Sequence, residues 1–402
     1  MTRNEQRTPS TTPVLASTST STSTASSSLR ELATLFLRLG ATAFGGPAAH
    51  IAMMEDEVVR RRGWLTHGEF LDLLGITNLI PGPNSTEMAI HIGQRRAGLR
   101  GLLVAGGAFI LPAAMLTAAL GWAYVRFGAQ PRSRALLYGI KPVMIAVVAQ
   151  ALLGLAPKAL KNRSLLVIAV LSLLAAAGGV NELLCLGLSG LAELLVRRRF
   201  APPPLMFGGV ASTGALAVAG AAKVVVAPFS LPALFLVFAK IGSVLFGSGY
   251  VLLAFLRSDF VEQRHWLSEA QLLDAVAVGQ VTPGPVFTTA TFIGYLLGGS
   301  AGALCATLGI FLPAFSFVAV SGLLLPKIRR SPSLGAFLDG VNVASLALMA
   351  LVTLQLCRAA LVDVKTVLLA SASAVLLVRF KLNSTWLNAT GALLGIALQA
   401  LG

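Results

Sequence analysis

Two Pro-Gly-Pro tripeptides, Pro81-Gly82-Pro83 and Pro283-Gly284-Pro285, contain the residues of this chain with the clearest chemical potential. A helix cannot run through them, because the prolines lack a backbone donor and the glycine permits a positive φ. A helix that begins after each tripeptide presents unpaired N–H groups and about half a unit of positive charge. In apolar surroundings such an end suits an anion, so the tripeptides predict two anion-binding helix ends.

Polar side chains beside these two breaks could add hydrogen bonds to a bound anion. Asn78 and Gln280 precede the breaks at equivalent positions and offer amide groups. The polar residues that follow the breaks are Asn84, Ser85, Thr86, Thr288 and Thr289. The same side chains could instead only cap the helices, because capping and ligand binding use the same atoms. The predicted substrate-binding set includes all of these residues except Thr289, together with Pro81, Gly82, Pro83, Pro283, Gly284 and Pro285.

Two cations, Arg38 and Lys240, occupy equivalent places in apolar segments. A cation at bilayer depth costs about 2.5–3.5 kcal/mol, so a matched pair needs an explanation. Two helix ends supply roughly one unit of positive charge, and these cations would complete the neutralisation of a dianion. The alternatives are snorkelling to the membrane surface, or pairing with an acid such as Glu87 or Asp72.

A glycine-rich motif marks a second break in each half of the chain. Phe44-Gly45-Gly46-Pro47 corresponds to Phe246-Gly247-Ser248-Gly249. Glycine lets the backbone approach a ligand, which adds Phe44, Gly45, Gly46 and Gly247 to the candidate substrate-binding residues. Helix packing alone would also explain these glycines.

Four acids near the breaks are candidates for coupling proton movement to transport: Glu55, Asp72, Glu87 and Asp274. Only Asp72 has an acidic counterpart, which is Asp274, so a local structural role is the alternative for the others. Searches for hydrolase, zinc-protease, phosphate-loop and dinucleotide motifs find no complete match, which argues against an enzyme. The three cysteines lie singly in apolar runs, so no metal or other cofactor is expected.

The elements that position these residues form an internal repeat. Nine residues of the first half, from Gly40 to Pro83, recur 202 positions later, and the offset becomes 201 beyond Gly93. The sequence predicts a disordered Ser/Thr-rich tail over 1–28, then homologous repeats over 29–200 and 201–402. The segment 205–228 has no counterpart in the first repeat.

Composition places both repeats in a lipid bilayer. Of the 402 residues, 55% are hydrophobic and only 12% are charged, and many apolar runs reach about 20 residues. The net charge of +15 is divided into short clusters between these runs, as in cytoplasmic loops of membrane proteins, which argues against nucleic acid as a partner. The fold class is therefore an all-α polytopic membrane protein, with the lipid bilayer as its surroundings.

Several predicted helices are too short to span a membrane alone. Segments 66–80 and 84–94 indicate a re-entrant or broken pair that meets at the first Pro-Gly-Pro. The remaining segments of the first repeat are 31–46, a more polar stretch 48–62, spans at 101–125 and 135–157, and short helices at 164–178 and 182–196. The second repeat follows with 231–249, 268–282, 286–299, 302–325, 335–360, 364–378 and 384–402.

Charge distribution indicates that the two repeats are inverted. The first repeat carries Arg95, Arg96 and Arg100 after its break, whereas the matching stretch 296–301 carries no charge. By the positive-inside rule, the first of these loops is cytoplasmic and the second is not, although Arg126, Arg132 and Arg134 would then lie outside. Inverted repeats with discontinuous helices are the architecture of secondary transporters, which hold substrate near the membrane midplane.

At these residues the sequence resembles the chromate ion transporter family, in its long form of two fused homologous domains. In the first repeat the likeness rests on Phe44 to Pro47, Glu55 to Trp64, Pro81 to Asn84 and the Leu111-Pro112 pair. In the second it rests on Phe246 to Gly249, Trp266 to Ser268 and Thr282 to Pro285. Gly249 and Val286 depart from the first-repeat pattern, so the first repeat is expected to carry more of the site.

The resemblance implies export of chromate, with sulfate-like oxyanions as further substrates, across the inner membrane, and resistance to chromate. A potential of about 100 mV is worth roughly 2.3 kcal/mol per charge and drives a dianion outward without another energy source. The alternatives are an anion channel or a sensor-like anion-binding membrane protein, and an assembly scaffold without transport. The sequence leaves the oligomeric state open, a homodimer included.

Overall fold

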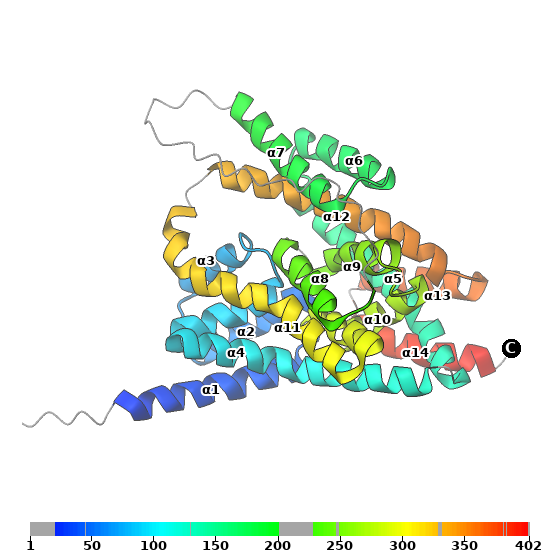
Figure 1. Cartoon of the computed structure of the whole chain (residues 1–402), viewed down its shortest axis with the longest axis horizontal. Helices are drawn as coiled ribbons and strands as arrows, with labels where there is room; N and C mark the ends of the chain where they lie inside the picture. The colour runs from blue at the N-terminus through cyan, green and yellow to red at the C-terminus, as the bar shows by residue number, and fades with distance from the viewer. Residues whose placement is uncertain are drawn as a thin grey trace, which may run out of the picture.

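The computed structural model of the chain is helical throughout its described part (Figure 1). It describes residues 21–44, 46–128, 130–200, 228–246, 249–328, 332–380, 382 and 384–400, and no strand occurs among them. Four of these helices are long and apolar enough to cross a membrane. The prediction of an all-α polytopic membrane protein is therefore confirmed.

Helix α1 (Ser21–Thr42) begins before the predicted start of the first repeat. The elements of this repeat are α1, α2 Gly46–Glu55, η1 Asp56–Arg61, α3 His67–Thr77, α4 Asn84–Phe127, α5 Pro131–Ala159, α6 Arg163–Ala177 and α7 Glu182–Phe200. Residues 21–28 are helical, so the predicted disordered tail is wrong there; residues 1–20 lie outside the described part. Once the apolar face of α1 forms a helix, each further residue extends it at little cost, even in a Ser/Thr-rich stretch.

The second repeat follows a similar order of elements. They are α8 Leu231–Val244, η2 Gly249–Val251, α9 Leu252–Leu256, η3 Arg257–Gln263, α10 Glu269–Val281, η4 Val286–Thr288, α11 Thr289–Ile328, α12 Pro332–Ala360, α13 Val364–Phe380 and α14 Ser384–Ala400. Here η2 and α9 stand in place of α2, and the short helix η4 precedes the long helix α11. Residues 205–227 of the predicted unmatched segment lie outside the described part. Helices α9 and η3 lie between the predicted segments 231–249 and 268–282 and were not predicted, whereas the later helices begin close to the predicted starts.

The broken pair predicted around the first Pro-Gly-Pro is present. Helix α3 ends at Thr77 and α4 begins at Asn84. Helix α4 itself kinks at Gly98, where φ is +59°, and α11 kinks at the equivalent Gly299, where φ is +60°. Each of these helices is therefore a short half-helix that starts at a break and then turns into a long span, as the predicted segments 84–94 and 101–125 require.

The repeats run in opposite directions, and two contacts demonstrate it. The Tyr138 hydroxyl, near the start of α5, donates to Asp363 Oδ2 at 2.6 Å, just beyond the end of α12. Lys161 Nζ, just beyond the end of α5, lies 2.6 Å from Asp339 Oδ1, near the start of α12. The equivalent helices α5 and α12 are therefore antiparallel neighbours, as expected for inverted repeats.

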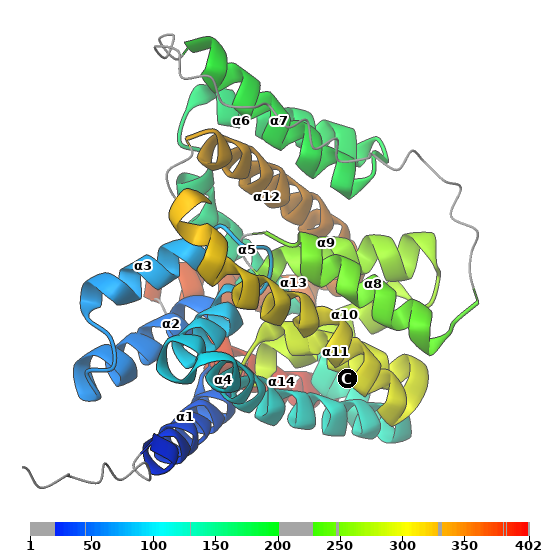
Figure 2. The same cartoon turned by 60° about the vertical axis from the view of Figure 1, so that its left-hand side comes forward.

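The last two helices of each repeat pack on the other repeat. Helices α6 and α7 lie against α12, while α13 and α14 lie against α5; Figures 1 and 2 both show α6 and α7 alongside α12. The contacts are close: a Cβ on Gly139 of α5 would lie 1.9 Å from the carbonyl oxygen of Gly391 in α14. A Cβ on Gly340 of α12 would lie 2.2 Å from the carbonyl oxygen of Ser189 in α7. The predicted helical hairpins thus join the two repeats.

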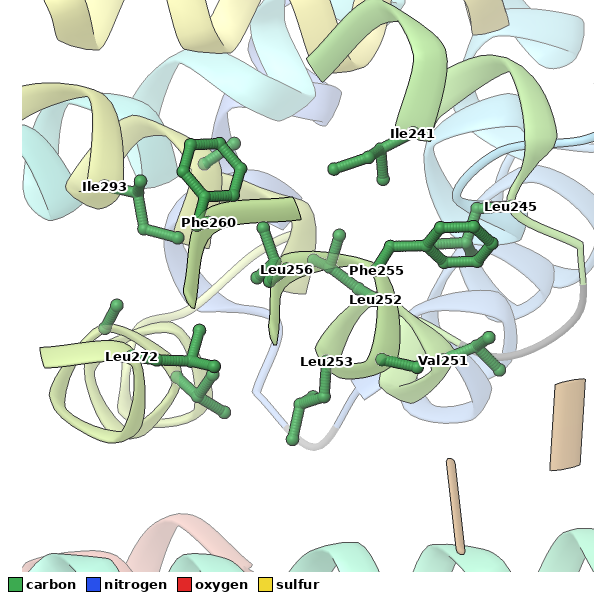
Figure 3. Close-up of a cluster of buried hydrophobic side chains, with 14 of the residues drawn as sticks. Ile241, Leu245, Val251, Leu252, Leu253, Phe255, Leu256, Phe260, Leu272 and Ile293 are labelled. Atoms are coloured by element: carbon green, nitrogen blue, oxygen red, sulfur yellow. The ribbon is translucent and has the colours of Figure 1, made fainter. Parts of the chain in front are cut away.

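The short helix α9 lies inside the molecule, where protein surrounds it. All five of its residues, Leu252–Leu256, are buried. Figure 3 shows them among side chains of α8, η3, α10 and α11, including Ile241, Phe260, Leu272 and Ile293. Interrupted helices are tolerated at membrane depth where they are enclosed by protein, so this cluster makes the irregular segment from Gly249 to Gln263 possible.

Candidate functional site

Each Pro-Gly-Pro break is bonded to the opposite repeat. The Gly82 N–H donates to the Leu245 carbonyl at 2.8 Å, and the Gly284 N–H donates to the Ala43 carbonyl at 2.9 Å. Leu245 and Ala43 are equivalent residues just after the first helix of each repeat, α8 and α1. The two breaks are therefore related by the inverted symmetry and lie in the interface between the repeats.

The central glycine of each break is required by its surroundings. Gly82 and Gly284 have φ of +140° and +84°, which L side chains rarely adopt. A Cβ on Gly284 would lie 2.7 Å from Ala113 Cβ, and one on Gly82 would lie 2.4 Å from Glu87 Oε1. Backbone conformation and close packing both exclude a side chain at these positions.

At the first break, polar side chains join α2, α3 and α4. Asn84 Nδ2 donates to Asn78 Oδ1 at 2.8 Å, and Ser85 Oγ lies 3.3 Å from His50 Nδ1. Thr86 Oγ1 is buried and has no hydrogen-bond partner in the described part of the chain. Pro83 at the N-cap offers no side-chain cap, so the start of α4 keeps backbone donors free of side-chain partners.

The second break differs in chemistry. The Thr288 hydroxyl donates to the Pro285 carbonyl at 2.8 Å, a bond within its own turn that caps no backbone N–H. Val286 stands where the first repeat has Asn84, and Gln280 Nε2 is buried without a partner among the described residues. The amide pair of the first break is therefore not reproduced at the second.

The residues of the glycine-rich motifs are only partly described. Phe44 is half-buried directly after α1, and Gly46 begins α2 with φ of +78°. Gly45 and Gly247 lie outside the described residues. The neighbouring Pro47 lines a cavity that also reaches the first break.

That cavity, which we call the Asn84 cavity, has a volume of about 970 Å³. It lies between the first break, the C-terminal half of α5 and the part of α12 from Asn342 to Met349. Its polar lining residues are Asn78, Asn84, Gln150, Lys158, Asn342 and Ser345. Lys158 is the single charged residue among the described residues that line it, and no ion pair of Lys158 occurs in the described part. Ser345 Oγ is buried there without a partner.

Arg38 and Lys240 are paired with acids. Arg38 forms an ion pair with Glu57, and Lys240 Nζ lies 2.6 Å from Asp259 Oδ1. Glu57 and Asp259 are equivalent residues, 6% and 1% exposed. Neither cation lines the Asn84 cavity. Pairing with an acid is thus the alternative that the structure supports, although the acids are not Glu87 or Asp72.

The sequence itself carries a signal for these acids, although no motif singles them out. Glu57 and Asp259 are 202 positions apart, and so are Arg62 and Arg264, which lie 3.4 and 2.9 Å from the same carboxylates. An acid between two cations therefore occurs in both repeats. Lys158 was missed as a site residue because its counterpart is Ala359 and the repeat gives no signal there.

The four candidate coupling acids have different surroundings. Glu55 Oε1 lies 3.1 Å from His67 Nδ1, and Asp72 is exposed on α3. Both carboxyl oxygens of Glu87 are buried without a partner in the described part of the chain. Asp274 lies 2.8 Å from Lys141 Nζ and accepts a hydrogen bond from the Tyr124 hydroxyl at 2.7 Å. Glu87 lies nearest the first break, since its Oε1 adjoins Gly82.

Comparison with known proteins gives a consistent result. A family model described as "Chromate transporter" matches the chain twice, over residues 30–194 and 232–396, again 202 positions apart. The chain is 35% identical to a chromate transport protein of Cupriavidus metallidurans, over 93% of this chain and 94% of that protein. It is also 35% identical to a chromate transport protein of Pseudomonas aeruginosa, with 82% of each chain covered.

A probable chromate transport protein of Synechococcus elongatus is 33% identical over 85% of this chain and 88% of that protein. No solved structure matches the chain. The relatives are transport proteins rather than enzymes, and the apolar helices agree with a multi-pass membrane protein. With two matching repeats and relatives that align along most of its length, the chain belongs to the chromate transporter family.

Proposed function

We propose that this protein is a secondary carrier that exports chromate, or a similar tetrahedral oxyanion, across the inner membrane and so confers chromate resistance. The proposal rests chiefly on the Asn84 cavity, which combines the start of a half-helix with four amide side chains and one lysine. No acidic residue occurs among the described residues that line this cavity. Chromate is proposed as the substrate because the relatives are named as chromate transport proteins.

Charge in the Asn84 cavity suits a dianion. Helix α4 begins at Asn84 and contributes about half a unit of positive charge, and Lys158 contributes one further unit. Asn78 at the end of α3 and Asn342 and Ser345 on α12 supply hydrogen-bond donors. A dianion in this cavity would be largely neutralised and could accept a hydrogen bond from the unpaired Ser345 hydroxyl.

The expected direction is outward. Lys158 lies at the same end of α5 as Lys161 and Arg163, which the positive-inside rule assigns to the cytoplasm. The cavity would then load from the cytoplasm. A membrane potential of about 100 mV, negative inside, favours outward movement of a dianion by about 4.6 kcal/mol.

For proton coupling, Glu87 is the favoured acid of the four candidates, because its unpartnered carboxyl group lies beside the first break. In proteoliposomes with an imposed pH gradient, Glu87→Gln should transport at a rate that no longer responds to the gradient. An unchanged response would exclude Glu87 as the coupling group.

Lys158→Gln tests the site directly in inverted vesicles supplied with labelled chromate. We expect at least a tenfold fall in uptake, about 1.4 kcal/mol, because the variant removes the main cation from the cavity. Lys161→Gln is the matched control: it removes a lysine three residues away whose ammonium pairs with Asp339 outside the cavity lining. Uptake unchanged in Lys158→Gln would reject the Asn84 cavity as the site, and single-channel currents would reject a carrier.

A further inference from the structure

A second cavity lies beside α10, and an ion pair between the repeats lines it. We call it the Lys141 cavity; its volume is about 670 Å³, and its lining includes Tyr124, Tyr138, Lys141, Asp274 and Val362. Lys141 Nζ lies 2.8 Å from Asp274 Oδ1, and the two side chains are 20% and 7% exposed. The Tyr124 hydroxyl donates to Asp274 Oδ2 at 2.7 Å. Lys141, which lines this cavity, is therefore paired with a carboxylate from the other repeat.

The two cavities lie toward opposite ends of the antiparallel helices α5 and α12. The Asn84 cavity is lined by Lys158 and Asn342, and the Lys141 cavity by Lys141 and Ala359. Lys141 is equivalent to Asn342, and Lys158 is equivalent to Ala359, each at an offset of 201. At these two pairs of positions each cavity therefore has one lysine, and both lysines come from α5.

The apolar middle of α5 separates the two lysines. They are 17 positions apart in one helix, which corresponds to about 25 Å at 1.5 Å per residue. All residues from Val143 to Val148 between them are buried. An anion that left one lysine would have to cross this apolar stretch before it reached the other.

We propose that the Lys141 cavity is a second subsite for the transported oxyanion, on the side of the membrane opposite the Asn84 cavity. When the substrate is absent, the Asp274 carboxylate forms an ion pair with the Lys141 ammonium group. The substrate displaces this carboxylate and binds the ammonium group itself. This inference rests on the proposed function, because it takes the substrate to be a tetrahedral dianion.

Asp274 and the substrate would compete for the Lys141 ammonium. Lys141 from α5 and Tyr124 from α4 both contact Asp274, whereas Tyr138 donates to Asp363. Removal of the Asp274 charge by substitution should therefore strengthen oxyanion binding in this cavity.

A thiol-protection experiment on the purified full-length protein can observe the two cavities separately. Cys185, Cys305 and Cys357 are first replaced by serine. Val362→Cys then reports on the Lys141 cavity and Leu153→Cys on the Asn84 cavity, since these two side chains are 65% and 66% exposed. The readout is the rate of labelling by a charged thiol reagent with sulfate added as a stable tetrahedral dianion, against chloride at equal ionic strength.

In the Asp274→Asn background at neutral pH, sulfate should protect Val362→Cys at a concentration about tenfold lower than with Asp274 present. Lys141→Gln should abolish protection at position 362 and leave protection at position 153 intact. Protection at 153 alone, in every background, would overturn the second subsite and leave the proposed function standing; protection at neither position would overturn both.

A purely structural ion pair makes a different forecast. The double variant Lys141→Gln/Asp274→Asn removes both charges and so restores packing without an unpaired ion. Our proposal requires that position 362 stays unprotected in this variant even where the protein is as thermally stable as its parent. Protection equal to that of Asp274→Asn alone would show that Lys141 is not the ligand and would overturn the assignment.

Discussion

A carboxylate between two basic side chains stabilises the start of each repeat. In the second repeat Asp259 lies within 2.9 Å of both Lys240 and Arg264, and Glu57 has the corresponding place between Arg38 and Arg62. The carboxylates are almost fully buried, whereas the cations reach toward the surface. These groups therefore fasten the first helix to the irregular segment that follows it.

Asp259→Asn should destabilise the protein, because it leaves Lys240 and Arg264 without a counter-charge. Breaking a buried pair in this way costs about 3–5 kcal/mol, and the partial exposure of Lys240 lowers the figure expected here. Thermal unfolding of the detergent-purified protein measures the loss. The control is Glu262→Gln, which removes a 47% exposed acid of the same segment and should change little. Equal stability of the two variants would contradict a structural role for Asp259.

The sequence predicted part of this arrangement. The matched positions of Arg38 and Lys240 could be recognised because the repeat offset is constant there. Their partners could not be identified from local pattern, since Glu57 lies 19 residues from Arg38 on a π-helical turn whose direction depends on the packing of α2. Lys158 and Asn342 come together only when α5 and α12 become neighbours, which neither helix encodes alone.

At the scale of elements, each half-helix ends at a sharp kink, after which the long span packs closely against it. The kink residues Gly98 and Gly299 have positive φ, and the flanking glycines lie almost in contact. A Cβ on Gly101 would lie 2.1 Å from the Gly93 carbonyl oxygen, and one on Gly302 would lie 2.1 Å from that of Gly294. The breaks and kinks were predictable from glycine and proline positions; the closeness of the two arms was not.

Gly101→Ala should therefore disrupt the return of α4. The new methyl group would meet backbone, which cannot move aside as a flexible side chain can, so we expect a loss of a few kcal/mol, about the cost of overpacking. Gly107→Ala in the same helix is the control, because nothing lies within 4 Å of its Cβ position. It should be neutral or slightly stabilising, since alanine is the better helix former. The yield of monodisperse protein and its unfolding temperature distinguish the two variants.

At the scale of the whole molecule, the repeats are joined by an exchange of helices as well as by their breaks. Helices α6 and α7 pack on α12 (Figure 2), and α13 and α14 pack on α5. The glycine N–H of each Pro-Gly-Pro donates to a carbonyl of the other repeat. Inversion was predicted from the arginines near Gly98, but the exchange was not, because equally apolar hairpins can pack on either long helix.

The exchange predicts that neither repeat is stable alone. A chain divided within residues 201–227, which lie outside the described part, should yield two fragments that copurify when expressed together, because each supplies the helices that cover the long span of the other. Either fragment expressed alone should aggregate or be degraded, since its long helix keeps an apolar, glycine-lined face without a partner. Copurification after affinity capture of one fragment measures the association.

Gly340→Val in the second fragment should weaken this association, because the larger side chain meets the Ser189 carbonyl of α7. Gly335→Val is the control and should not weaken it, because nothing lies within 4 Å of its Cβ position. Stable, monodisperse single fragments would contradict the exchanged arrangement.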